Sequence, residues 1–251
     1  MTETISAKQP VRRFDLPRVF ATLLRPRQTF SEAVAEARST WLTPMLILSI
    51  TALLVVLVSG YLRTRAAQMG EVPLPPNWQS MTPDMQNNYI QAQQLTQGKV
   101  FMYGIPLLSA SSGLWIGWII VAGLLHLGST LLGGRGSMQS ALNIVAWANL
   151  PFAIRDVLRV AYMLFASHAI TSPALSGFAG NMFMWQFLAL VDVFLIWNIV
   201  LLIIGFSTSN GLPFGKAFVG VMVVVLILLA TQAGVGTLLS GLSGASVQRP
   251  F

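Results

Sequence analysis

Four ionisable side chains lie within otherwise apolar stretches of the chain, where charge is least compatible with its surroundings. Arg155, Asp156 and Arg159 occupy one apolar run, and Asp192 occupies the next. Arg155 and Arg159 share one helical face because they are four residues apart. Charges inside a membrane span are costly unless they are paired or hydrated. We therefore expect an intramembrane polar cluster with a bridge from Arg155 or Arg159 to Asp192; snorkelling of the arginines to the headgroups is the alternative.

The other reactive residue types do not form a recognisable site. No Asp or Glu lies near His126 or His168 in the sequence and the chain has no cysteine, so no metal site is predicted. Gly133, Gly134 and Gly136 indicate a tight turn, because no Lys-Ser or Lys-Thr pair follows them to make a phosphate loop. No catalytic triad spacing is evident. We predict no enzyme and no cofactor of its own; approach of His126 to a pigment or haem of a partner stays open.

The composition points to lipid as the surroundings of this protein. Of its 251 residues 54% are apolar and 9% are charged, whereas a soluble globular chain carries roughly 25% charged residues. The formal net charge is +7, and about half of the basic residues precede Trp41. This bias is typical of the cytoplasmic flank of a first span. No basic patch with interleaved aromatic residues lies outside the apolar runs, so nucleic acid is not a predicted partner.

Five apolar runs are long enough to cross a hydrocarbon core about 30 Å thick. They predict an all-α polytopic membrane protein with five transmembrane helices. The expected spans are about 41–62, 101–132, 138–166, 184–207 and 216–240, with a polar external loop at 63–98 and a short tail at 241–251. An odd number places the termini on opposite sides. The excess of basic residues on the N-terminal side favours a cytoplasmic N-terminus.

The segment 1–40 is expected to be cytosolic and to hold amphipathic helices at the membrane surface. Apolar residues recur there at helical spacing between basic residues, which favours a helix in the headgroup layer: Leu16, Val19, Phe20, Leu23 and Leu24. A second helix is expected to start at Thr29, whose hydroxyl can cap it while Glu32 reaches back to the Thr29 amide. Within the external loop, Thr82-Pro83-Asp84 also predicts a helix start.

Two features of the spans bear on helix packing. Ser109, Gly113 and Gly117 recur every four residues, which lets another helix approach closely. We favour packing within the protein, with a partner or a homo-oligomer as the alternative. Pro151 predicts a kink in the third span, because it cannot donate a backbone hydrogen bond. Broken helices can also build transport sites.

Three segments resemble the Yip1 family of five-span membrane proteins. They are 25–30 with Trp41 and Pro44, 132–138 continuing to Ala146, Ala148 and Pro151, and 197–205 with 212–213 and 216–217. The resemblance implies a five-helix protein that binds partners, namely small GTPases in eukaryotes and, in some bacteria, ABC-type exporters. It implies no catalytic residues. The tyrosine-containing motif of eukaryotic trafficking members is not evident, so a vesicle-transport role is not carried over.

Three functions follow as hypotheses. The preferred one is a non-enzymatic accessory or scaffold protein beside a larger membrane complex, with an ABC-type exporter as the expected partner. The resemblance to bacterial members implies that its membrane is the bacterial inner membrane. The second is a small transporter or lipid-moving protein that uses the polar cluster and the kink. The third is an accessory subunit of a respiratory or photosynthetic assembly.

Overall fold

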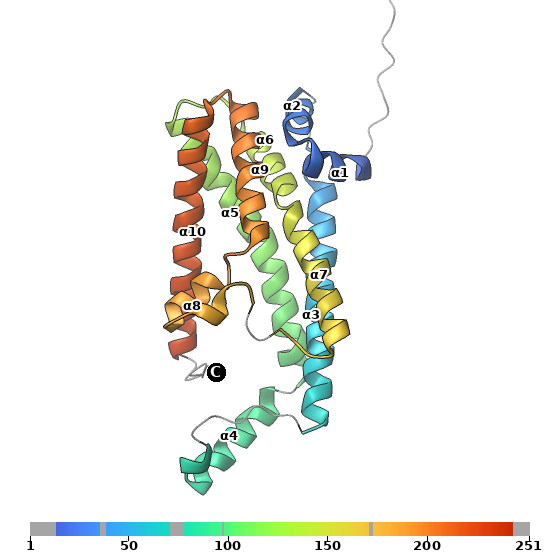
Figure 1. Cartoon of the computed structure of the whole chain (residues 1–251), viewed down its shortest axis with the longest axis vertical. Coiled ribbons are helices and arrows are strands. Elements are labelled where there is room, and N and C mark those ends of the chain that lie inside the picture. The colour runs from blue at the N-terminus through green and yellow to red at the C-terminus, as the bar shows by residue number, and fades with distance from the viewer. Residues whose placement is uncertain (1–13, 36–38, 71–77, 97, 171–172, 243–251) are drawn as a thin grey trace, which may run out of the picture.

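The computed structural model describes residues 14–35, 39–70, 78–96, 98–170 and 173–242, and the regular structure within these ranges is helical. The predicted all-α class is therefore confirmed for this part of the chain. The start of the segment 1–40, part of the external loop and most of the predicted tail lie outside the described residues. Long helices run side by side, with α1 and α2 at one end of the bundle and the end of α10 toward the other (Figure 1).

Four helices among the described residues are long and apolar enough to cross a membrane. They are α3 (Leu42–Gln68), α5 (Ile105–Leu131) with the π-turn Val100–Gly104 before it, α9 (Val193–Asn210) and α10 (Phe214–Leu242). Helix α3 continues past the charge-free run into Arg63 and Arg65. Three of the four correspond to predicted runs, and α9 differs from its run at the start.

The predicted third span, 138–166, is divided into two helices next to Pro151, where the sequence predicts a kink. Helix α6 (Met138–Ala148) ends before Asn149, and α7 (Leu150–Ala166) begins directly after it. Pro151 occupies the first turn of α7, where its missing N–H costs no intrahelical hydrogen bond. The two helices follow one another along the bundle (Figure 1). Neither reaches the length of a spanning helix, so continuous helices do not supply the predicted count of five.

The predicted fourth span starts in the wrong place. Residues Met182–Leu188 form a short helix, α8, the helix is interrupted at 189–192, and α9 starts at Val193. Two side chains that cap helices set these starts: Asn181 Oδ1 accepts from Met184 N at 2.8 Å, and Asp192 Oδ1 accepts from Leu195 N at 2.8 Å. Asp192 therefore begins α9 instead of lying some way along a span, because an N-cap aspartate satisfies amides that the helix leaves unpaired.

Helix α1 (Leu16–Leu24) forms as predicted, but its apolar residues divide between two faces. Val19 and Leu23 pack against the core, whereas Leu16, Phe20 and Leu24 are exposed. The helix lies across the direction of the long helices, beside the start of α3 (Figure 1).

Helix α2 (Pro26–Ala35) begins three residues before the predicted start at Thr29. The Thr29 hydroxyl donates to the Arg25 carbonyl at 3.2 Å instead of capping the helix, because Pro26 already fits the first helical position. Phe30 is 1% exposed and lies beside Gly205 of α9. Helix α2 is thus part of the packed bundle, and the expectation that it lies on the membrane surface is wrong for its Phe30 face.

The external loop contains helix α4 (Pro83–Thr96), whose predicted start is confirmed. The Met85 amide donates to Thr82 Oγ1 at 3.4 Å, as expected of a capping threonine before a proline at the first helical position. Helix α4 projects beyond the far end of the bundle (Figure 1).

The core lies where α6 meets its neighbours. Trp147, Val145 and Ala146 of α6 are at most 1% exposed, and Leu201 and Phe206 of α9 are 1% and 2% exposed. From Ala141 to Ala148 nearly every residue of α6 is buried, so this short helix is deeply enclosed by protein.

Candidate functional site

The four charged residues named from the sequence gather between α7 and α9. Arg155 Nη1 lies 3.5 Å from Asp192 Oδ2, and Arg159 Nη2 lies 4.0 Å from the same oxygen. Arg155 Nε also lies 3.4 Å from Asp156 Oδ1. The structure therefore places both arginines against Asp192, with Asp156 beside Arg155.

Helix geometry accounts for this meeting. Arg155 lies about 26 Å along the chain of helices from Met138, and Asp192 lies about 27 Å along α9 from Asn210, at 1.5 Å per residue. The turns at these two helix ends touch, because the Arg135 amide donates to the Asn210 carbonyl at 3.2 Å. Two antiparallel paths of equal length from one contact bring the charges to the same level.

The cluster balances its own charge with two arginines and two aspartates. The Asp156 and Asp192 side chains are 11% and 13% exposed, and the Arg155 and Arg159 side chains are 23% and 26% exposed. The Arg155 guanidinium also lies 4.7 Å from the centre of the Phe152 ring, a cation–π contact. Asp192 both caps α9 and accepts from Arg155, so this arrangement fastens α7 to the start of α9.

A residue that sequence reasoning missed closes the break between α6 and α7. Asn198 Nδ2 donates to the Ala148 carbonyl at 2.8 Å and to Asn149 Oδ1 at 2.9 Å. Asn198 is 5% exposed, so these bonds replace water that the site excludes. The signal was present in the sequence, since a carboxamide within the apolar run of α9 needs a partner and Pro151 leaves carbonyls without donors.

Thr40 makes a similar link at the start of α3. Its amide donates to Asn143 Oδ1 at 3.0 Å, and its hydroxyl accepts from Trp147 Nε1 at 3.1 Å. The Asn143 and Trp147 side chains of α6 thereby find hydrogen-bond partners outside the helix. Nothing in the spacing of the sequence pointed to Thr40, because its partners lie more than a hundred residues away.

The glycine-rich turn between α5 and α6 packs against the turn between α9 and α10. Gly133 has φ +93°, which favours glycine. A Cβ on Gly136 would overlap the Asn210 carboxamide, and one on Gly134 would lie 2.8 Å from the Ser129 carbonyl. The glycines of the family motif therefore serve a close contact between turns, and Asn210 is the residue that makes it.

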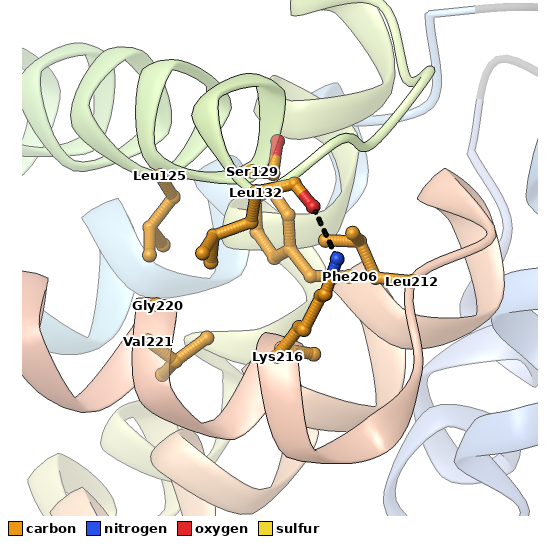
Figure 2. Close-up of a pocket in the computed structure, with 9 residues that line it drawn as sticks. Leu125, Ser129, Leu132, Phe206, Leu212, Lys216, Gly220 and Val221 are labelled. Atoms are coloured by element: carbon orange, nitrogen blue, oxygen red, sulfur yellow. Dashed lines mark hydrogen bonds between the residues drawn. The ribbon is translucent and has the colours of Figure 1, made fainter.

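Lys216 supports the same junction from α10. Its Nζ donates to the Leu132 carbonyl at 3.2 Å. Figure 2 shows this bond at a small pocket whose lining includes Leu125, Phe206 and Val221. The lysine thus satisfies a carbonyl that the end of α5 leaves free.

The small residues of α5 face open space. Gly113 and Gly117 have no neighbour within 4 Å of an added Cβ, and Ser109 is exposed. The favoured expectation that this stripe packs against another helix within the protein is therefore wrong for the described residues. Close approach occurs instead at Gly60, where Tyr103 packs, and at Gly205, where Ile144 packs. Only 11% of the apolar stretch of α5 is buried, against 39% for α9.

The architecture and its apolar helices define a multi-pass helical membrane protein. Residues 20–235 match the Yip1 domain family, which is most of the chain, and the chain belongs to this family. The family predicted from three short segments is thereby confirmed. Neither a curated protein nor a solved structure matches the chain.

Proposed function

We propose that the chain is a non-enzymatic accessory or scaffold protein that packs beside a larger integral membrane complex, with an ABC-type exporter as the expected partner. The observation that carries the proposal is the uncovered face of α5. This helix is the least buried of the four candidate spans. Its exposed face combines small residues with large apolar side chains such as Ile116 and Ile120, which are 57% and 48% exposed.

Small residues on an uncovered face favour a helix over lipid as the neighbour. Lipid tails cover any apolar surface equally well, whereas helices gain dispersion contacts where glycine lets two backbones approach. A crevice between α3 and α5 adjoins this face and is lined in part by Ser49, Ala52, Ala110 and Ser111. A partner helix lying along α5 would have both the glycine row and this crevice as complementary surface.

The same proposal takes α6 and α7 together as one broken crossing. The chain then crosses the membrane five times, with the N-terminus in the cytoplasm of a bacterial cell. The hydrogen bonds of Asn198 to the break support this count, because they make the interruption compatible with a membrane interior.

The polar cluster supports a structural role more than a transport path. Its arginines and aspartates are directed at one another, and Asp192 is also engaged in capping α9. A transport site needs polar groups that turn to a substrate, so we do not assign one to these residues.

Purification from native membranes in mild detergent tests the proposal. The wild-type chain should bring a stoichiometric partner with it, and the double substitution Gly113→Leu with Gly117→Leu should lose that partner, because leucines would hold the helices apart. Gly234→Leu is the matched control: its site on α10 is also open, and it should retain the partner. A wild-type chain that runs alone, or only with a second copy of itself, would contradict the accessory role.

A further inference from the structure

Tryptophans gather at the end of the bundle where α3 begins. The Trp41 ring lies 6.1 Å from that of Trp115 and 4.9 Å from that of Trp118, and Trp147 donates to the neighbouring Thr40. Trp118 and Trp147 are 6% and 1% exposed and belong to the core, so this cluster fixes the start of α3 against α5 and α6.

The length of α3 indicates where the membrane surface lies. The run 41–62 contains no charged residue and ends at Arg63. Twenty-two helical residues span about 33 Å, which matches a hydrocarbon core of about 30 Å. If Arg63 lies at one membrane surface, Trp41 lies at the other.

Helix α1 lies at the level of Trp41. The Asp15 amide donates to Thr43 Oγ1 at 3.2 Å, and the Arg18 guanidinium lies 6.0 Å from the centre of the Trp147 ring. The inner face of α1 is fixed to the bundle, since Thr22 is fully buried. Because α1 crosses the bundle direction (Figure 1), it runs along the membrane surface and not through it.

The outer face of α1 is apolar and continues into positive charge. Leu16, Phe20 and Leu24 are spaced by four residues and are 61%, 70% and 79% exposed. Arg25 and Arg27 follow, and both are exposed. Water is a poor environment for such a row, whereas apolar side chains beside basic residues are typical of a helix bound in the headgroup layer.

We propose that α1 is a binding surface for anionic phospholipid. Its three outer apolar side chains enter the boundary between headgroups and acyl chains, and Arg25 and Arg27 bind lipid phosphates. The inference is independent of any partner complex, because it concerns the leaflet beside α3 and not the α5 face. Phe30 of α2 is buried beside Gly205, so α2 packs directly on α9. The helix that binds lipid would thus be connected to the core of the bundle through α2.

The absence of cysteine from the chain allows a direct test of depth. Phe20→Cys and Gln28→Cys, each labelled with the fluorophore NBD, are compared in nanodiscs of phosphatidylcholine and phosphatidylglycerol. Gln28 is exposed on α2 and bonds to Glu32, so it is the control expected to stay in water. The label at position 20 should emit at shorter wavelength and be quenched by spin-labelled lipid. Equal, water-like emission at both positions would overturn the proposal.

A second variant tests the anionic preference without altering the apolar row. Native mass spectrometry of the purified full chain compares retained phosphatidylglycerol with phosphatidylcholine. Replacing Arg25 and Arg27 by glutamine should lower the preference for the anionic lipid about 30-fold, as expected for two basic groups near a charged surface. An unchanged preference in this variant would overturn the assignment of these arginines, and a partner complex has no bearing on either result.

Discussion

The α6–α7 pair and α5 differ in helical continuity and in how far other parts of the protein cover them. The pair is interrupted, yet α6 is enclosed and its polar groups bond to Thr40 and Asn198. Helix α5 is continuous, and Gly113 and Gly117 meet nothing within 4 Å. The more irregular helix is thus the better supported one.

The buried polar groups of α6 and α7 stabilise the fold, whereas the exposed small residues of α5 are available to a neighbouring molecule. Buried irregularity with satisfied hydrogen bonds stabilises the chain itself, so changes there should lower stability. An open row of small residues contributes little to folding of the isolated chain. Changes there should alter association and leave stability intact.

The largest effect should come from Gly205→Leu in α9. A Cβ at this position would lie 2.5 Å from Ile144 Cγ2 and 3.5 Å from the Phe30 ring, so a larger side chain must displace α6 or α2. We expect a loss of about 3 kcal/mol in the free energy of unfolding, near the upper range for overpacking a tight core. Unfolding in detergent by titration with SDS, followed by near-ultraviolet circular dichroism, measures it. Stability equal to that of Gly113→Leu would erase the distinction between the two regions.

Asp192→Asn should have the next largest effect. Asparagine can still cap α9, so the substitution isolates the charge that Arg155 and Arg159 share. We expect a loss of about 2 kcal/mol, less than for a fully buried pair because the arginines are partly exposed. The same SDS titration measures it. Unchanged stability in Asp192→Asn would remove the bridge from the account.

Asn198→Ala should cost about 1–2 kcal/mol, because the Ala148 carbonyl and the Asn149 side chain lose a donor in a site that excludes water. Asn88→Ala on the exposed surface of α4 is the matched control and should change stability little. Thermal unfolding of both variants in the same detergent gives the comparison. If the two variants melt together, Asn198 does not support the break.

The smallest effect on stability should come from Gly113→Ala in α5. Alanine fits the open space without losing a contact and has the better helix propensity, so the unfolding free energy should equal that of the wild type or exceed it by up to about 1 kcal/mol. The same thermal assay measures it. A clear loss of stability would mean that the Gly113 face of α5 packs within the protein and is not open to a partner.

The sequence predicts the helices whose positions follow from apolar composition. It does not predict the helix ends and hydrogen bonds that depend on polar groups far apart in the chain. Charge-free length is enough to locate α3 and α10, and Thr82-Pro83 locates the start of α4. The apolar run around 184–207 does not predict the start of α9, because mean hydropathy cannot distinguish an aspartate that caps a helix from one within a span. The cluster itself could be named from charge balance, whereas Asn198 and Thr40 act on groups that only the tertiary fold brings near.

The small-residue stripe shows a different limit. Its spacing predicts a face suited to close approach, but spacing does not say what approaches. Within the described residues, helices approach closely at Gly60 and Gly205, which form no such stripe. A glycine's environment depends on its neighbours, and those are set by the whole bundle.

Site-specific photocrosslinking in native membranes shows directly whether a partner protein covers the exposed face of α5. A benzophenone amino acid is placed at Ile116, beside the glycines of α5, and at Val223 on α10; these residues are 57% and 50% exposed. We expect one discrete crosslinked partner protein from position 116 and lipid adducts alone from position 223. Lipid adducts alone from both positions would contradict it.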